Sequence, residues 1–478
     1  MSTVLLLLAT VAFAETPVTL EDVERSAVGA NPTLQRSMAE VDAAEGRLLT
    51  TRGIFDPMLA LGPSWTRATS KGFFQGFPVD QKSLAWDVGA DLGGRTRFGT
   101  TYGVSLGVDR QFGTFQTDFG AGQTETTQDA YGATLGASLR QPLLEGFGAS
   151  YTMRYLRQAT AGVERAELSA RSQQQSTIAK AAIAYWAWAY SEQALRIAGD
   201  AEATAKEALR VGGLREDAGT IAPIELVRLE ASEVQARTQR IDAEHAVIRA
   251  RHAVELVAGL RLAADARASS ELGAPAAPVD EAAAMTLALA NNPDLLVLRR
   301  LQEEAASSLG DARHTLRPQL DAVASAGLGT NEDTLGAAMA GVVDGSGFPS
   351  VRLGADFSIP LGNRSARGDV DAATADLHGL ELQVAETEAL IRAQVDEAVL
   401  SVQSAAQRVE LADANERLQK ALLGAEEAKI EAGGSIEQDL LQVRTAYASA
   451  RAEAFRTRTD LRVAEVELGR LQGALLVP

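Results

Sequence analysis

Two carboxylates follow the main glycine-rich breaks of the chain. Glu225 lies in "AGTIAPIEL" and Asp439 lies in "AGGSIEQDL", and the two positions are 214 residues apart. Each falls in the first turns of the helical stretch that follows its glycines. A carboxylate there interacts favourably with the positive end of the helix dipole. Several carboxylates around one narrow opening would instead select cations. The spacing alone leaves both roles open.

The glycine-rich breaks predict tight turns between helices, because glycine adopts backbone conformations that strain other residues. Ser435 is the expected N-cap of the second helix, and Gln438 three residues later would complete a capping box. The candidate turn residues are Gly219, Thr220, Gly433, Gly434 and Ser435.

Two other groups of residues are better explained by structure than by chemistry. His245 and His252 are seven residues apart, and two helical turns separate them too far to share one metal ion. The stretch "AYWAWAY" at residues 184–190 places four aromatic side chains mid-helix. Aromatic residues on a helix mostly serve burial, so packing is favoured over the stacking of a cargo molecule.

Composition excludes several classes of function. The 478-residue chain has no Cys, four His and a formal net charge of −18. It therefore offers no thiolate chemistry, and its acidity argues against nucleic acid as a partner. The sequence has no glycine-rich phosphate loop, no nucleophile elbow and no zinc-protease motif. We expect neither an enzyme nor a cofactor or metal site.

The N-terminus has the pattern of an export signal. The run "VLLLLATVAF" precedes "AFA", a small-x-small cleavage site. We expect residues 1–14 to be removed, although the usual basic residue before the run is missing and the true start could lie upstream. No stretch is long enough for a membrane-spanning helix, so insertion into a membrane would depend on strands.

The rest of the chain contains an internal sequence repeat. "PVTLEDVERSAVGANPTL" and "PVDEAAAMTLALANNPDL" are 261 residues apart, Pro142 and Pro360 are 218 apart, and Gly259 and Gly473 are 214 apart. The changes of offset predict a 43-residue excess between Pro57 and Pro142 and a four-residue excess in the helices. The predicted segments are a first repeat at 15–260, a linker at 261–277 and a second repeat at 278–478.

Each repeat combines long helices with short strands. Residues 151–260 and 362–473 are rich in helix-forming residues and each predicts a long helix–turn–helix. Residues 57–142 and 318–361 contain alternating stretches such as "VRLGADFSI", which predict strands with one apolar face. Phe73, Phe74 and Phe77 fall in a glycine-rich stretch that we expect to be a loop able to touch lipid headgroups. Four strands are expected, or six if the 43-residue excess is an extra hairpin and not a loop.

Membrane barrels need at least eight strands, so one chain cannot close a barrel. Three chains with four strands each would give twelve. The motifs "ANPTL", "FDPML", "RQPLLEGFG", "AGTIAPIELVRLEA" and "AGGSIEQDLLQVRTAYASAR" occur in an order, and with a duplication, that resembles the TolC family of outer-membrane channels. The resemblance covers essentially the whole chain after the signal peptide. Unlike many members of that family, this chain has no lipid-carrying N-terminal Cys.

The resemblance implies a mixed α/β membrane protein with two internal repeats. The family fold is a homotrimer with a twelve-stranded barrel in the outer membrane, continued by a long helical tunnel through the periplasm. The implied function is passive export, with an inner-membrane transporter and a periplasmic adaptor protein as partners. The family has an acidic ring at its periplasmic constriction, and Asp439 matches one position of that ring. The next acidic position falls at Gln442, which carries no charge, and Glu225 corresponds to Asp439 across the internal repeat. An exported structural coiled-coil protein is the alternative. The cargo, whether drug, metal or protein, and the particular pump and adaptor stay open.

Overall fold

The computed structural model describes residues 18–74, 77–118, 123–263, 265–269, 279–431 and 437–475. The predicted signal peptide at 1–14 and most of the predicted linker lie outside these residues. The chain divides into two compact units. The first unit comprises Met1–Asp42, Glu164–Arg300 and Leu382–Pro478, and the second comprises Ala43–Val163 and Leu301–Glu381. Each unit therefore takes segments from both sequence repeats.

Long helices build the first unit and continue into the second. Eight helices of the described residues correspond between the two repeats, and the short α3 (Ala149–Thr152) precedes α4. The eight are α1 (Leu20–Ala30), α2 (Pro32–Arg52), α4 (Arg154–Asp217), α5 (Pro223–Ala258), α6 (Glu281–Asn291), α7 (Pro293–His314), α9 (Arg364–Glu431) and α10 (Glu437–Leu471). α4 and α9 contain 64 and 68 residues, each followed by a turn and a second long helix. In the described part of the chain, no helix is both long and apolar enough to cross a membrane.

Two separate cores hold the helical unit together, one for each repeat. The first core contains Val23 and Ala27 of α1, and the second contains Ala284 and Ala288 of α6 at the corresponding positions. All four side chains are almost fully buried. Small alanine side chains at these positions let the short helices pack close to the long ones. The predicted aromatic stretch lies in the first core, where Trp188 is 0% exposed.

The duplicated Asn-Pro motif joins a short helix to the end of a long one. Asn31 accepts hydrogen bonds from the backbone N–H groups of Thr33 and Leu34, and its amide donates to the carbonyl of Val257 at 2.8 Å. Asn292 makes the same set of bonds in the second repeat, where its amide donates to the carbonyl of Leu471 at 3.2 Å. The motif is repeated because each repeat needs both the cap and the tether.

Glycine is required where the end of a long helix approaches the end of the short helix in the same repeat. Gly259 and Gly473 follow α5 and α10, and both have φ of +64°. A Cβ on Gly259 would lie 2.7 Å from the carbonyl oxygen of Ala30, and one on Gly473 would lie 2.5 Å from that of Asn291. Any side chain would therefore add both backbone strain and a steric clash.

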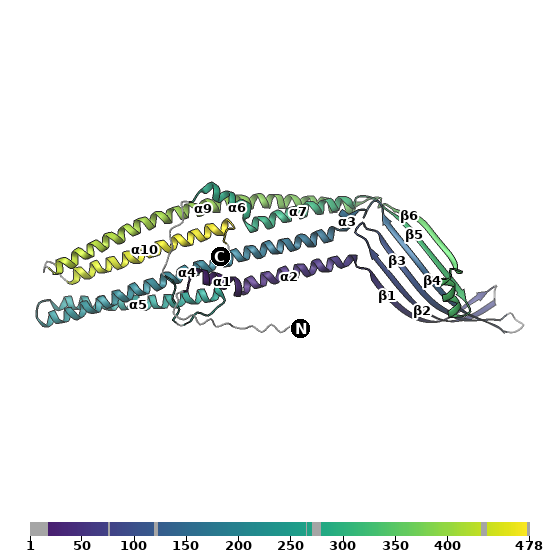
Figure 1. The fold of residues 1–478 in the computed structure, drawn as a ribbon, viewed down its shortest axis with the longest axis horizontal. Helices are drawn as coiled ribbons and strands as arrows, with labels where there is room; N and C mark the ends of the chain where they lie inside the picture. Colours follow the sequence, from purple (N-terminus) through teal and green to yellow (C-terminus); the bar gives the residue numbers. More distant parts are fainter. Residues whose placement is uncertain are drawn as a thin grey trace. The chain divides into compact units, whose positions relative to one another are not determined.

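The second unit contains one antiparallel sheet in the order β1-β2-β3-β4-β5-β6 (Figure 1). Its strands are β1 (Met58–Phe74), β2 (Phe77–Arg95), β3 (Thr101–Asp118), β4 (Gln123–Pro142), β5 (Gln319–Glu332) and β6 (Phe348–Ser358). The first repeat supplies four strands and the second supplies two. The 43-residue excess is therefore an extra hairpin, and the chain has six described strands, the larger of the two expected numbers.

The expected loop around Phe73, Phe74 and Phe77 is wrong. Phe73 and Phe74 end β1, and Phe77 begins β2. The register pairs Phe74 with Phe77 and continues without interruption to Met58 opposite Gly93. Glycine is depleted in strands, so the glycines in this part of the sequence favour a loop. Here the pairing with the neighbouring strand decides the conformation.

A short apolar helix, α8 (Leu335–Val343), connects β5 to β6 and covers part of the sheet. Ala338 of α8 and Ala133 of β4 bury each other completely. The hydroxyl of Thr330 in β5 donates to the carbonyl of Ala338 at 2.8 Å. This helix was not predicted, because a nine-residue apolar stretch between two strands has no clear helical or strand period.

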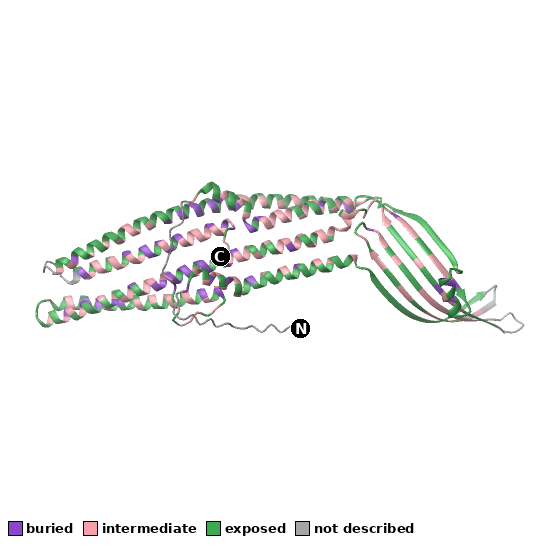
Figure 2. Ribbon diagram, viewed as in Figure 1, coloured by how far each residue is buried: buried purple, intermediate pink, exposed green. Residues whose placement is uncertain are grey.

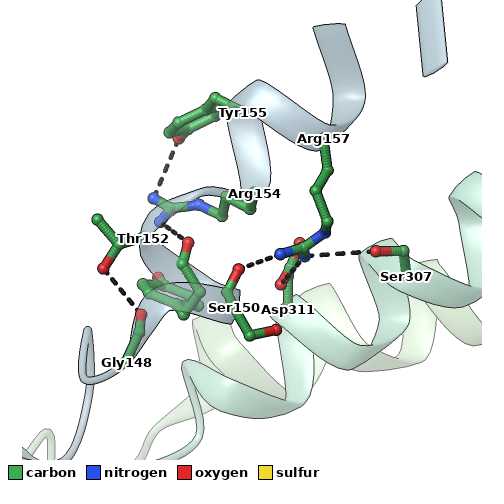
Figure 3. A network of polar contacts seen from close by, with 9 residues as sticks. Gly148, Ser150, Thr152, Arg154, Tyr155, Arg157, Ser307 and Asp311 are labelled. Carbon is green, nitrogen blue, oxygen red and sulfur yellow. Dashed lines mark hydrogen bonds and ion pairs between the residues drawn. The ribbon is translucent and has the colours of Figure 1, made fainter. Parts of the chain in front are cut away.

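A polar network fixes the point where the chain leaves the sheet and enters α4 (Figure 3). Arg157 donates to both carboxylate oxygens of Asp311 on α7, at 3.1 and 3.2 Å. The Arg154 guanidinium lies 4.1 Å from the ring centre of Tyr151 and 4.3 Å from that of Tyr155. The ion pair between Arg157 and Asp311 ties the start of α4 to α7, and Arg154 packs against the two tyrosines of its own segment.

Candidate functional site

One face of the six-stranded sheet is apolar from edge to edge. The register places Ala90, Leu106, Leu135 and Leu328 in one row across four neighbouring strands. Rows on either side of it follow the same pattern. The exposed apolar residues of this face are Leu59, Leu61, Val88, Leu92, Tyr102, Val104, Leu106, Leu135, Leu139, Val351, Leu353 and Phe357. Such a continuous apolar surface is typical of the lipid-facing side of a membrane barrel.

The opposite face of the same strand segments is polar. Its charged residues are Asp87, Asp91, Arg95, Asp109, Arg140, Asp321, Arg352 and Asp356. Asp321 and Asp356 stand directly opposite each other in β5 and β6. Arg140 of β4 binds both, at 2.8 Å and 2.9 Å. This ion pairing offsets the repulsion between two carboxylates, and it fits the water-filled side of a pore wall.

A row of three amphipathic aromatic side chains and one arginine ends the apolar band. Trp65, Trp86, Arg110 and Tyr131 lie opposite one another in β1 to β4. The rings of Trp86 and Tyr131 meet edge to face at 6.4 Å, and the Arg110 guanidinium lies 5.1 Å from the Tyr131 ring centre. Aromatic girdles of this kind mark the membrane–water interface of barrels. Phe73 lies eight residues beyond Trp65 on the same strand, so the tryptophans are the better candidates for headgroup contact.

The first predicted turn is a helix C-cap. Gly219 has φ of +72°. Its N–H donates to the carbonyl of Glu216 at 2.7 Å, and the N–H of Thr220 donates to that of Arg215 at 2.8 Å. This pair of bonds is the Schellman motif. The Thr220 hydroxyl also donates to the Arg215 carbonyl. Gly219 and Thr220 therefore terminate α4.

Glu225 lies at the third position of α5, after Ala222 and Pro223. In the described part of the chain, no side chain caps the N-terminus of α5. The carboxylate of Glu225 accepts a 2.8 Å hydrogen bond from the guanidinium of Arg228. The sequence reasoning missed Arg228, although its spacing of three residues on a helix predicts this ion pair. Part of the charge of Glu225 is thus offset by a neighbour.

Asp439 and Gln442 are both exposed on the first turns of α10. Asp439 contributes to raising the pKa of Lys429 on α9, although the larger cause is the hydrogen bond from Lys429 to Glu426. Arg444 joins the same two helices through an ion pair with Glu427 at 3.1 Å. Gly433, Gly434 and Ser435 lie outside the described residues, as does the side chain of Gln438. The expected capping box therefore stays a prediction.

The remaining candidate residues have structural surroundings. Tyr185 donates from its hydroxyl to the carbonyls of Val18 and Ser269, at 3.2 and 3.3 Å. Burial raises the pKa of Tyr185 to about 12. The expectation that the aromatic stretch serves packing is thus confirmed. His252 contacts Glu255 on its own helix, and His245 is exposed. Among the described residues, no group of three or more potential ligands could hold a metal ion.

Known proteins share both sequence and fold with this chain. Residues 284–474 match the family described as outer membrane efflux protein. This part of the chain, about two fifths of its length, therefore resembles outer-membrane efflux proteins. The whole-chain fold is similar to the CmeC outer membrane channel of Campylobacter jejuni, with 14% identity, a TM-score of 0.66 and coverage of 95% of this chain and 85% of that one.

Two further channels have a similar fold. VceC of Vibrio cholerae is 16% identical, with a TM-score of 0.66 and coverage of 95% of this chain and 96% of that one. The open state of MtrE of Neisseria gonorrhoeae is 17% identical, with a TM-score of 0.66 and coverage of 95% and 88%. No curated protein sequence matches the chain.

The TolC-type fold explains the two-sided sheet and the long helices. The proteins of similar fold are described as outer-membrane channels. Channels of this family are homotrimers and are not enzymes.

Proposed function

We propose that this TolC-type channel is the passive exit duct of a tripartite export system. Cargo would enter from a periplasmic adaptor and an inner-membrane transporter and leave through the outer membrane. The observation that carries this proposal is the sheet with an apolar and a charged face, joined to helices of 64 and 68 residues. An exported coiled-coil protein without a channel would need the helices but not such a sheet.

The first test is assembly and conductance. Protein extracted from the outer membrane should run as a heat-modifiable trimer and should form ion-conducting pores in planar bilayers. N-terminal sequencing of the same material should return Glu15, if residues 1–14 are the signal peptide. A water-soluble monomer without pore activity would instead support the coiled-coil alternative.

We further propose that Asp439, Glu225 and Gln442 surround the periplasmic entrance, near the turns at Gly219–Thr220 and Gly433–Ser435. In a trimer, the two acidic positions would place six carboxylates around one opening, which would favour cations. Because Arg228 already pairs with Glu225, Asp439 should contribute more to selectivity. The competing explanation is helix stabilisation by the dipole alone, worth a few tenths of a kcal/mol up to about 1 kcal/mol.

Single-channel recordings on three variants separate these roles. Asp439→Asn should reduce cation selectivity and block by trivalent cations, while thermal stability stays nearly unchanged. Glu225→Gln should do the same to a smaller degree. Arg228→Gln should have the opposite effect, because it exposes the full charge of Glu225. Unchanged selectivity in all three, with a lower melting temperature for the acidic variants, would leave only the helix-stabilising role.

A further inference from the structure

The extra hairpin of the first repeat is built like the rest of the sheet. The register of β2 against β3 runs from Val79–Thr117 to Arg95–Thr101 without a break. Leu59 stands opposite Leu92, and Leu61 stands opposite Ala90, so the apolar band continues across β1. Ser64 stands opposite Asp87 on the polar face and donates a hydrogen bond to its carboxylate. A hairpin that only formed a loop in water would not need one apolar face and one polar face.

The aromatic row also continues onto the hairpin. Trp65 and Trp86 supply two of its three aromatic rings, and Arg110 of β3 and Tyr131 of β4 complete the row. A hairpin that carries both the apolar band and the aromatic boundary is suited to lie at the same depth in a membrane as the neighbouring strands.

Both outer edges of the described sheet are open. Within the described residues, neither the outer edge of β1 nor that of β6 has a neighbouring strand. Figure 2 shows β6 exposed along its length, and the described side chains of β1 are mostly exposed as well. In lipid, each unpaired backbone group would cost several kcal/mol, so an open edge cannot persist there. Six strands are too few to close on themselves, because membrane barrels begin at eight.

We propose that β1 of one protomer pairs with β6 of the next, so that three chains form an eighteen-stranded wall. The proposal rests on the trimeric channel proposed above. An even number of strands per chain places β1 antiparallel to the neighbouring β6, as the rest of the sheet requires. A twelve-stranded wall would instead need β3 at the seam, and it would expel β1 and β2 by breaking the whole β2–β3 ladder. The observed pairing of β2 with β3 is therefore incompatible with a twelve-stranded wall unless the sheet rearranges.

A wider wall has a consequence for transport. Barrel diameter grows roughly linearly with strand number, so eighteen strands give about one and a half times the diameter of twelve. The barrel would then be a wide outlet, and selection by size would fall to the helical part of the channel. The polar face of β1 and β2 would line this lumen and add Asp87 and Asp91 to its acidic surface.

Disulfide cross-linking can locate the seam, because the natural chain has no Cys. One cysteine is placed at Ser350 of β6, which faces the polar side and is exposed. The second is placed in β1 or, as a matched comparison, on the same face of β3. The β1 positions are Ala60, Ser64 and Ala68, and the β3 positions are Thr101, Ser105 and Gln111. Within one chain β4 and β5 separate β3 from β6, so any cross-link must join two chains.

After oxidation in native outer membranes, at least one β1 variant should migrate as a covalent trimer on a denaturing gel without reductant. The β3 variants should stay monomeric. Cross-linking of the β3 series alone, or of neither series in a heat-stable trimer, would overturn the eighteen-stranded wall while leaving the channel intact. Absence of any trimer, cross-linked or not, would refute the proposed function itself. Counting strands in an electron cryomicroscopy map of the unmodified trimer gives an independent answer, with eighteen supporting the proposal and twelve refuting it.

Discussion

Replacement of Leu106 by Arg tests which face of the sheet meets lipid. Leu106 lies on the apolar face of β3, with Ala90 on one side and Leu135 on the other. Both neighbours are apolar, so an arginine there would have no carboxylate on this face to bind directly opposite. An arginine on the lipid face near the bilayer midplane costs about 2–4 kcal/mol. Three copies in a trimer would cost roughly 6–12 kcal/mol, as much as the whole stability of many domains.

The matched control is Ser105→Arg, one residue earlier on the polar face. Asp91 stands directly opposite Ser105, so the new charge would have both water and an anionic neighbour. We expect Ser105→Arg to change folding by less than about 1 kcal/mol, the usual effect of an exposed charge pair.

Two measurements decide the comparison. The first is the yield of heat-modifiable trimer in the outer membrane, and the second is the urea midpoint for folding into lipid vesicles. Leu106→Arg should abolish most of the trimer and lower the midpoint, whereas Ser105→Arg should retain both. Equal losses in the two variants, or a loss confined to Ser105→Arg, would show that the faces are assigned wrongly.

The other predictions concern the helical unit. Asn292→Ala should cost about 1–3 kcal/mol in urea unfolding, because it removes a buried cap and leaves the Leu471 carbonyl without its bond. Asn292→Asp should also lose stability, because it keeps both N–H bonds but replaces the amide donor to Leu471 by a buried carboxylate oxygen. Gly473→Ala should lower the melting temperature by several degrees, because φ is +64° and the new Cβ would meet the Asn291 carbonyl; an unchanged melting temperature would contradict the close approach. Burial, with Glu21 as a lesser cause, raises the pKa of Glu24 to about 7. The folded state therefore binds more protons than the unfolded state between pH 4.5 and about 7, and stability should fall as pH rises through that range. Glu24→Gln should flatten this dependence in unfolding experiments at pH 5 and pH 8.

Local pattern was sufficient for much of the fold. Helix-forming residues with helical spacing predict α4, α5, α9 and α10, because each helical hydrogen bond joins residues four apart in sequence. The strands with clear alternation, such as β6, were also predicted. The duplication at fixed offsets identified the Asn-Pro motif, which the structure shows to be one tether made twice, at Asn31 and Asn292.

Features that depend on distant partners could not be predicted. The glycines around the end of β1 favour a loop, and the strand there comes from pairing with β2 along its full length. Arg140 becomes part of the lumenal network only because the sheet places Asp321 and Asp356 beside it. The two carboxylates of the proposed entrance, Glu225 and Asp439, were found from the repeat, but the different ionic surroundings of each required the folded helices.

The two repeats, the long helices and the amphipathic strands could be predicted from residue patterns, and the sequence contains no catalytic motif that we recognise. The number of strands that stand side by side, and the faces that form one continuous surface, became known only from the folded sheet. The physical reason is that a helix is stabilised by contacts within a few residues, whereas a sheet is stabilised by pairings between strands. The pairing of β4 with β5 joins segments nearly 200 residues apart, and no short stretch of either strand encodes its partner.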